Sequence, residues 1–356
     1  MTRRGALAAL AVAILLAGCG GSTRNVVSGG EVPGTTRTVY SLLPHPGRGA
    51  SRDMVLGEKL AIAEAGGRAG GFALSLVSLD ESAPGPAKLS ARAGVLAERA
   101  VHDAQVIAVF GGTSSEAART TIPLIDAAGI LHLLPAAGYP GFTRRWQSPD
   151  EPARWQPSGS GRNIVRLVPD DAEQGRALVA AAVRAAGRHG KRVRIAVEQE
   201  PGFTADALRE AIVRAAGSAR IVGSSGKADV VIYAGTDPVN AAGVARSVAH
   251  AGKPVVLPDE VVFAGAADHL DAATKRRTIL VSGAPAPDDP AVRRIAPAFE
   301  RAFGVRPGPY ALIGYRAMNA VISALDRVGG RDRRRQAVTA AFQPPPSVRF
   351  TAYRAD

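Results

Sequence analysis

The stretch that decides the fold is Val106-Ile-Ala-Val-Phe-Gly-Gly-Thr-Ser-Ser115. Its first five residues are apolar and mostly β-branched or aromatic, which predicts a buried strand. Two glycines then permit a tight turn, and the Thr and Ser side chains can cap a helix that begins near Ser115. Free backbone N–H groups at such a junction can bind an anion. An ordinary helix cap without a ligand is the alternative interpretation.

The same alternation runs along the chain from Arg37, with short apolar runs followed by Ala-rich stretches of helical spacing. This pattern predicts α/β units and mostly parallel sheets. The expected strands are 38–43, 72–79, 105–110, 130–134, 163–167, 192–197, 219–222, 229–234, 254–257 and 278–281. The expected helices are 53–65, 89–103, 115–128, 171–187, 204–216, 238–251, 265–275, 290–303, 310–328 and 332–342. So many strands fit two sheets better than one.

Composition excludes several classes of protein. The 356 residues are 46% hydrophobic and 21% charged, which is ordinary globular usage and argues against disorder, collagen or a coiled coil. One Cys excludes an internal disulfide framework and a Cys-rich metal site. The net charge of +13 comes mainly from Arg, alongside many Ala, Gly and Pro. GC-rich codons explain this composition as well as a polyanionic partner does.

No catalytic arrangement is found in the sequence. The six His are scattered, and neither an HExxH nor a GxSxG motif occurs. Residues 223–227 (GSSGK) lack the four-residue gap and the final Ser or Thr of a phosphate-binding P-loop. The Arg-rich run 331–335 is interpreted as a solvated helix face. We therefore expect no enzymatic activity, no cofactor, no metal and no nucleic-acid partner.

The N-terminus has the pattern of a secretory signal, with Arg3 and Arg4 before a short apolar run. Its end, Leu16-Ala17-Gly18-Cys19, resembles the lipobox of bacterial lipoproteins, which implies cleavage after residue 18 and lipidation of Cys19. A plain signal peptide is the alternative. Residues 19–36 are rich in Gly, Ser and Thr and predict a flexible tether. We expect an extracytoplasmic protein that is anchored to the cell membrane as a lipoprotein.

Several segments, in order and spacing, resemble the type 1 periplasmic binding proteins. They are 53–67, 106–115, 123–130, 134–138 and 308–315. The closest resemblance is to the branched-chain amino-acid (Leu/Ile/Val) binding components of ABC transporters. It implies two Rossmann-like lobes that close around a ligand cleft. The N-terminal lobe would comprise 37–167 and 284–340, and the C-terminal lobe 168–283 and 341–356.

The resemblance also implies a set of ligand-binding residues. They are Ser114, Ser115, Ala137, Gly138, Phe203, Thr236 and Asp259. The hydroxyl of Ser115 and the backbone near Gly138 would hold a carboxylate. Phe203 and Asp259 would meet an ammonium, and the side chain of Glu260 is expected to point away from the cleft.

The sequence departs from that family pattern at several places. Gly138 stands where the family often has Thr, and Phe203 lacks the phenol that Tyr would supply. The segment 144–162 is longer than the usual link and could cover the cleft or pack outside it. The link 223–228 is too short for a helical crossover. These departures leave the ligand open.

These inferences together favour a lipid-anchored solute-binding protein of an ABC transporter. Its partners would be an amino acid or similar small molecule, the permease subunits and the membrane. The alternative is a lipid-anchored ligand sensor or interaction module with the same fold and no transport role.

Overall fold

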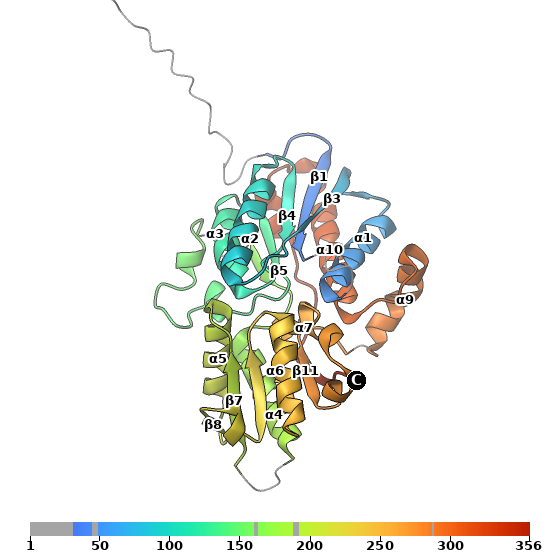
Figure 1. The fold of residues 1–356 in the computed structure, drawn as a ribbon. Coiled ribbons are helices and arrows are strands. Elements are labelled where there is room, and N and C mark those ends of the chain that lie inside the picture. The colour runs from blue at the N-terminus through green and yellow to red at the C-terminus, as the bar shows by residue number, and fades with distance from the viewer. Residues whose placement is uncertain (1–30, 45–48, 160–162, 188–191, 287) are drawn as a thin grey trace, which may run out of the picture.

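The computed structural model describes residues 31–44, 49–159, 163–187, 192–286 and 288–356. Within these residues the chain forms two six-stranded sheets, each flanked by helices, which define a first and a second lobe (Figure 1). The expected fold class of two α/β lobes with mostly parallel sheets is therefore confirmed. Cys19, the predicted signal and most of the predicted tether lie outside the described residues.

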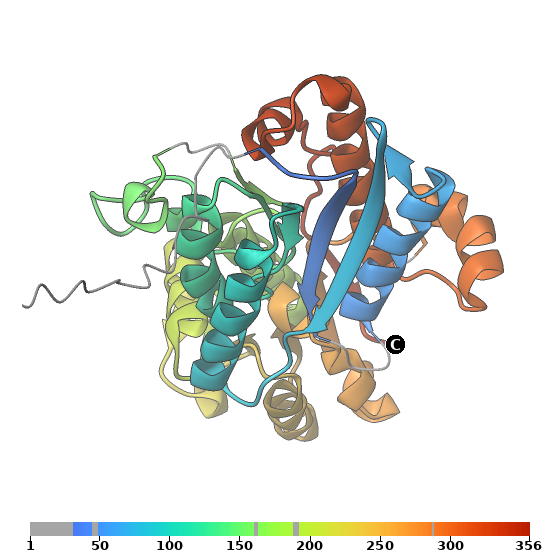
Figure 2. The same ribbon diagram turned by 90° about the horizontal axis from the view of Figure 1, so that it is seen from above.

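The first sheet has the strand order β2-β3-β1-β4-β5-β6, and only the β2–β3 pair is antiparallel. Its strands are β1 (Thr36–Leu43), β2 (Arg68–Ala69), β3 (Phe72–Asp80), β4 (Val106–Phe110), β5 (Leu131–Leu134) and β6 (Ile164–Arg166). One face is covered by α2 (Pro86–His102) and α3 (Ser115–Ala127). The other face is covered by α1 (Ala50–Glu64), α10 (Pro309–Val328) and α11 (Arg335–Ala341), as Figure 2 shows from above. Helix α9 (Pro290–Phe303) packs on the outer side of α1.

The second sheet has the order β12-β11-β10-β9-β7-β8, and its β11–β12 pair is antiparallel. Its strands are β7 (Arg194–Gln199), β8 (Arg220–Val222), β9 (Val230–Ala234), β10 (Val255–Leu257), β11 (Thr278–Ser282) and β12 (Thr351–Arg354). Helices α4 (Asp171–Ala186) and α5 (Phe203–Ala215) cover one face. The other carries α6 (Pro238–His250), α7 (Asp259–Phe263) and the 3-10 turn η4 (Ala266–His269), with α8 (Ala272–Lys275) beside them.

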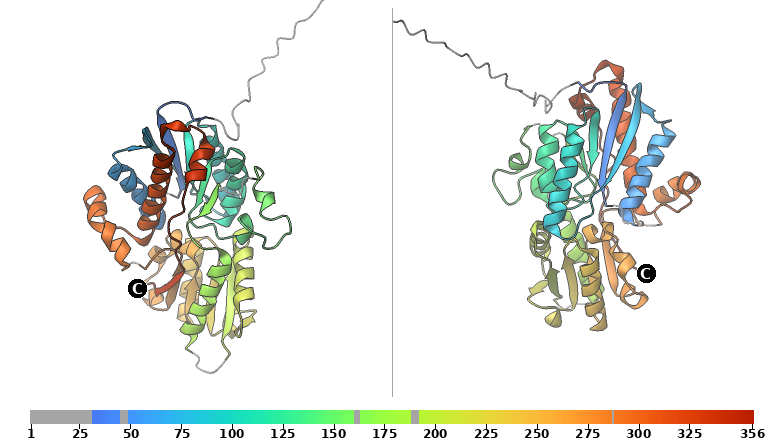
Figure 3. Two further views of the ribbon diagram at one scale, coloured as in Figure 1. Left: turned by 180° about the vertical axis from the view of Figure 1, so that it is seen from behind. Right: turned by 45° about the horizontal axis from the view of Figure 1, so that its top comes forward.

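The chain passes between the lobes three times: from β6 to α4, from β11 to α9, and from α11 to β12. The left view of Figure 3 shows the last passage, which descends from the helices of the first lobe to β12. Neither lobe is therefore a continuous piece of the sequence. Among the described residues, no helix has the length and apolar character that crossing a membrane requires.

Two expectations about local structure were wrong, and polar side chains explain one of them. The helix expected at 265–275 is broken, because Leu270 is extended and the Asp271 side chain accepts a 2.8 Å hydrogen bond from Thr274 N to cap α8. No element is among those expected between 257 and 265, but α7 begins at Asp259. The short link 223–228 holds only the 3-10 turn Ser225–Lys227. It suffices although the chain must cross β7 to reach β9, because β8 has only three residues and the return path along it is short.

The crossing of α1 and α10 depends on two glycines that face each other's helix. A Cβ at Gly57 would lie 2.1 Å from Ala311 O, and one at Gly314 would lie 2.2 Å from Met54 O. These separations are far below van der Waals contact, so the helices approach this closely only with glycine at both positions. The close approach brings both helices onto the core of the first sheet.

We expect Gly314→Ala to destabilise the protein by about 1–3 kcal/mol, because the added methyl forces the two backbones apart. The control is Gly243→Ala in α6, where no atom lies within 4 Å of the new Cβ. It should stabilise by up to about 1 kcal/mol through helix propensity alone. Equilibrium unfolding in urea measures both. Equal stability of Gly314→Ala and the wild type would contradict the close-packing argument.

Candidate functional site

A cavity of about 290 Å³ lies where the carboxyl ends of the two sheets face each other. From the first lobe it is lined by Pro44, Ser82, Ala83, Leu89, Thr113 and Ser114. From the second lobe it is lined by Thr236, Pro238, Glu260, Phe263, Ala264 and His269. Most of these residues directly follow a strand, which is where open α/β sheets place their ligands. This cavity is therefore the candidate binding site.

The junction between β4 and α3 already contains a carboxylate of the protein. Ser114 caps α3 by accepting a 3.2 Å hydrogen bond from Ala117 N. Behind it, the fully buried Glu81 accepts hydrogen bonds from the Thr113 hydroxyl at 2.5 Å and from Thr113 N at 3.3 Å. Burial raises the pKa of Glu81 to about 7 despite these bonds. One backbone N–H of this turn, that of Thr113, is thus hydrogen-bonded to Glu81 and is not free for a ligand.

Three of the predicted site residues are not part of the cavity lining. Ser115, Ala137 and Gly138 are all buried. The hydroxyl oxygen of Ser115 accepts a 3.0 Å hydrogen bond from Tyr139 N. A Cβ at Gly138 would lie only 1.8 Å from Oδ1 of Asp171, whose backbone N donates to Gly138 O at 2.8 Å. The Asp171 side chain thus explains why Gly stands where a Thr was expected.

Acidic side chains gather on the second-lobe side of the cavity. The amide nitrogen of Gln174 donates to Asp171 Oδ1 at 3.2 Å and to Glu260 Oε1 at 3.1 Å. Glu260 lines the cavity although its exposed fraction is only 3%. Burial, and then the nearby charges of Asp171 and Asp259, raise the pKa of Glu260 well above its usual range. These buried acids form a site that can receive a positive charge.

The positions of Asp259 and Glu260 are the reverse of those expected. The Oδ1 atom of Asp259 accepts hydrogen bonds from the Tyr310 hydroxyl and, at 2.7 Å, from Gly283 N. Burial raises the pKa of Asp259 to about 6. Because α7 starts right after β10, successive side chains are rotated by about 100°. Glu260 therefore lines the cavity, while Asp259 is hydrogen-bonded on the side of Tyr310.

Phe203 and Thr236 have different surroundings. Phe203 belongs to an aromatic cluster, with ring centroids 4.7 Å from Tyr139 and 6.1 Å from Trp155. Thr236 lines the cavity, and its backbone N donates to Glu200 Oε2 at 2.8 Å. Of the predicted ligand-binding residues, the structure brings Ser114 and Thr236 together at the cavity wall.

The described part of the 144–162 insertion bridges the two lobes. The guanidinium of Arg214, in α5, lies over the Trp146 ring, with its Cζ atom 4.3 Å from the ring centroid. Gln147 donates a hydrogen bond to Glu210, also in α5. Glu151 holds the loop in shape by accepting from the backbone N of Gln147 at 2.9 Å. None of the described residues 144–159 is among those that line the cavity.

Sequence reasoning missed three acidic residues at the junction of the lobes. Glu81 directly follows β3, Glu200 directly follows β7, and Glu260 comes three residues after β10. The signal that could have found them is a Glu just beyond the end of an apolar strand, because all parallel strands end at the same edge. Glu200 by itself accepts two backbone hydrogen bonds, one from the N–H of Thr236 and one, at 3.3 Å, from the N–H of Asp237.

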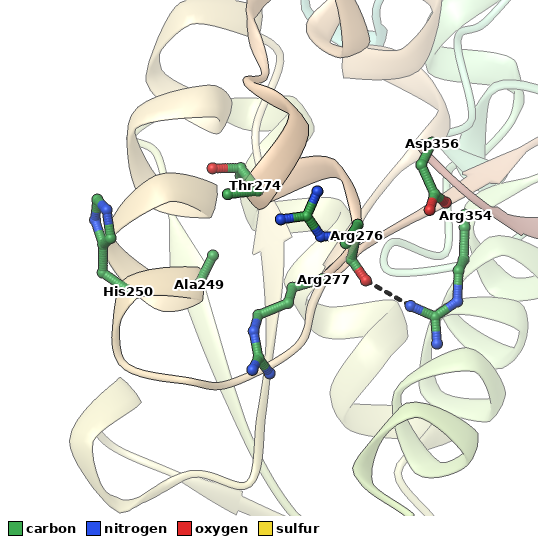
Figure 4. Close-up of a pocket in the computed structure, with 8 residues that line it drawn as sticks. Ala249, His250, Thr274, Arg276, Arg277, Arg354 and Asp356 are labelled. Carbon is green, nitrogen blue, oxygen red and sulfur yellow. Dashed lines mark hydrogen bonds between the residues drawn. The ribbon is translucent and has the colours of Figure 1, made fainter.

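A second hollow, of about 530 Å³, has the opposite charge character (Figure 4). Arg276, Arg277 and Arg354 line it together with His250. Arg276 and Arg277 come just before β11, so this hollow lies at the amino ends of the strands. It is therefore at the far end of the second lobe from the cleft.

Glu81 predicts a measurable dependence of stability on pH. Its pKa is about 7 when folded against a usual 4.5, so the folded state holds this proton more tightly. The stabilisation is full below about pH 4.5 and is lost as pH rises through about 7. From pH 5 to pH 8, the wild type should lose up to about 3 kcal/mol relative to Glu81→Gln. Urea unfolding at each pH measures this difference.

The matched control is Glu98→Gln, at an exposed position of α2. This variant removes a surface carboxylate and leaves the buried surroundings of Glu81 unchanged. A pH-independent difference between Glu81→Gln and the wild type would mean that Glu81 ionises normally.

The sequence matches no protein-family model and no curated protein. Solved structures do resemble it in fold. A leucine binding protein, LivK, from Thermotoga maritima is 16% identical, with a TM-score of 0.68 over 86% of this chain and 86% of that one. An ABC transporter substrate-binding protein from Desulfitobacterium hafniense, in complex with Leu, is 22% identical, with a TM-score of 0.60 over 86% and 87%.

A third structure is the solute binding protein of an ABC transporter from Rhodopseudomonas palustris, in complex with 3,4-dihydroxybenzoic acid. It is 20% identical, with a TM-score of 0.65 over 86% of this chain and 85% of that one. Most of both chains is matched in each case. The chain therefore has the two-lobed fold of the type 1 periplasmic binding proteins.

Proposed function

We propose that this chain is an extracytoplasmic solute-binding protein of an ABC transporter. Its ligand is an amino acid of the branched-chain type or a similar small molecule, and its protein partners are the permease subunits. The observation that carries the proposal is the cavity between the carboxyl ends of the two sheets, with polar residues of both lobes in its wall. The similar structures support it, because Leu and 3,4-dihydroxybenzoic acid are bound by two of them.

We propose that Ser114 and Thr236 contact the ligand directly and that Glu260 takes the part implied for Asp259. Ser115, Ala137 and Gly138 shape the floor of the site, and Phe203 holds the lobes together at its edge. A volume of about 290 Å³ is at the small end of ligand pockets, which favours a small solute.

We further propose that binding works by hinge closure. Residues 37–167 and 284–340 move as one body, and 168–283 and 341–356 as the other. In the conformation described, Glu116 at the start of α3 bridges the lobes: its N donates to Thr204 Oγ1 at 2.9 Å, and its Oε2 accepts from Phe203 N at 3.0 Å. Such polar contacts can be exchanged for water when the lobes open.

A ligand that closes the lobes should stabilise the protein. At 100 times its dissociation constant a solute adds about 2.7 kcal/mol, which raises the unfolding midpoint of a chain this size by several degrees. A thermal-shift screen of amino acids, amines and small carboxylates finds it. Trp fluorescence reports closure for the same solute, because Trp146 contacts Arg214 and Trp155 contacts Phe203, both in α5. If the screen finds no solute that both stabilises the protein and changes the fluorescence, the proposal is contradicted.

We propose that Cys19 carries the lipid anchor and that residues 19–36 tether the lobes to the membrane. Cys19→Ser should release the protein from the membrane fraction or leave the signal uncleaved, because the acyl chains then have no attachment point. Cell fractionation and the mass of the N-terminal peptide measure this. Unchanged membrane retention together with normal cleavage would show that Cys19 is not the anchor.

A further inference from the structure

We infer that the cleft takes a small organic cation, a primary amine with an apolar body, and disfavours ligands whose polar end is a carboxylate. The inference rests on the proposed function, since it concerns the ligand of that same site. Within that proposal it favours a small amine, as the similar small molecule, over an amino acid. Three independent features of the cavity carry it: the charge of its lining, the use of its backbone amides, and its apolar wall.

The first feature is the charge of the lining. None of the described residues in the cavity wall is Arg or Lys, although the chain has 44 of them. Glu260 is in the wall, is 3% exposed, and its Oε2 has no hydrogen-bond partner in the described structure. A ligand in the cavity can supply that partner, and an ionised buried carboxylate gains most from one because an unpaired charge is costly there. Only His269, exposed at the rim, could add a positive charge among these lining residues.

The second feature is that the protein's own side chains bind the amides that a carboxylate ligand would use. In the first turn of α3, Glu116 N donates to Thr204 and Ala117 N to Ser114, so at most the Ser115 amide remains. Thr113 N donates to Glu81. An incoming carboxylate would therefore meet few free donors here.

The same holds on the second lobe. In the turn after β9, the backbone N of Thr236 donates a hydrogen bond to Glu200. The Asp237 side chain caps α6 by accepting a 2.8 Å hydrogen bond from Val239 N.

A carboxylate ligand would thus lie close to Glu260 with no Arg or Lys in the cavity wall, an unfavourable arrangement in a buried site. The nearby charge of Arg166 acts on Asp171, and Arg166 is not among the lining residues. An ammonium in the same place would satisfy Glu260 by a charge-assisted hydrogen bond.

The third feature is the apolar remainder of the wall. Leu89, Phe263 and Pro44 supply hydrocarbon surface, and Phe263 is itself fully buried against the core. The cavity of about 290 Å³ limits the ligand to a short aliphatic chain or one ring. A compact monoamine fits both the polar and the apolar parts of the site.

Proton release supports this assignment. In the empty cleft, burial and the charges of Asp171 and Asp259 raise the pKa of Glu260, which also faces Gln174 and the cavity. A bound cation favours the ionised carboxylate, so binding should release a proton and tighten as pH rises from 6 to 8.

The test is calorimetry at pH 8 with three compounds that share the same isobutyl group: 3-methylbutylamine, leucine and 4-methylpentanoate. We expect the amine to bind at least 10-fold more tightly than leucine, and the carboxylate not to bind. The heat of amine binding should vary with the ionisation enthalpy of the buffer. Benzylamine and benzoate repeat the comparison with a ring in place of the isobutyl group.

Variants locate the effect. Glu260→Gln should weaken amine binding about 10- to 100-fold, the loss expected for one charge-assisted hydrogen bond. The control Glu173→Gln, at an exposed position of α4, should bind like the wild type. Tighter binding of leucine than of 3-methylbutylamine, or binding of either carboxylate, would overturn the inference and leave the proposed solute binding intact. No binding by any of the five compounds, with no change in Trp fluorescence, would count against both.

Discussion

Acidic side chains of the protein bind the backbone amides at the edge where the two sheets meet. Glu81, Glu116 and Glu200 each accept from at least one backbone N–H beyond a strand or at the first turn of a helix. These bonds fix the shapes of the loops that face the other lobe, and they place several carboxylates in a poorly hydrated region. The raised pKa values of Glu81 and Glu260 follow directly from that placement.

This arrangement separates charge within a strongly basic protein. The interior edge between the lobes is acidic, whereas Arg276, Arg277 and Arg354 surround a hollow at the other end of the second sheet. The net charge of +13 therefore says little about the cleft, because the local field of a desolvated site is set by the few groups that face it. Glu116 adds a second function, since its side chain and backbone join α3 to α5 across the lobes.

Much of the fold could be predicted from sequence, because each expected strand has a clear apolar run and each long helix a clear periodicity. Segments whose structure depends on partners that are distant in the sequence could not be predicted in this way. Strand β12 is short and half exposed and exists by pairing with β11, and the break before α8 comes from one capping Asp. Of the ligand-binding residues that the resemblance implies, Ser114 and Thr236 line the cavity, and their role stays a prediction. Glu260 was missed because the start of α7 decides which of two adjacent acids faces the cavity.

The long helix α10 has a consequence for how the chain folds as it is made. It comes near the end of the sequence, yet Ile313, Met318 and Val321 belong to the core that covers the first sheet, beside α1. During synthesis the strands of the first sheet, which end at Arg166, are made long before α10, which begins at Pro309. In the meantime one face of that sheet lacks the helix that covers most of it. Throughout that interval the exposed apolar strands are open to wrong association, so chaperone binding during synthesis would protect the first lobe more than the second.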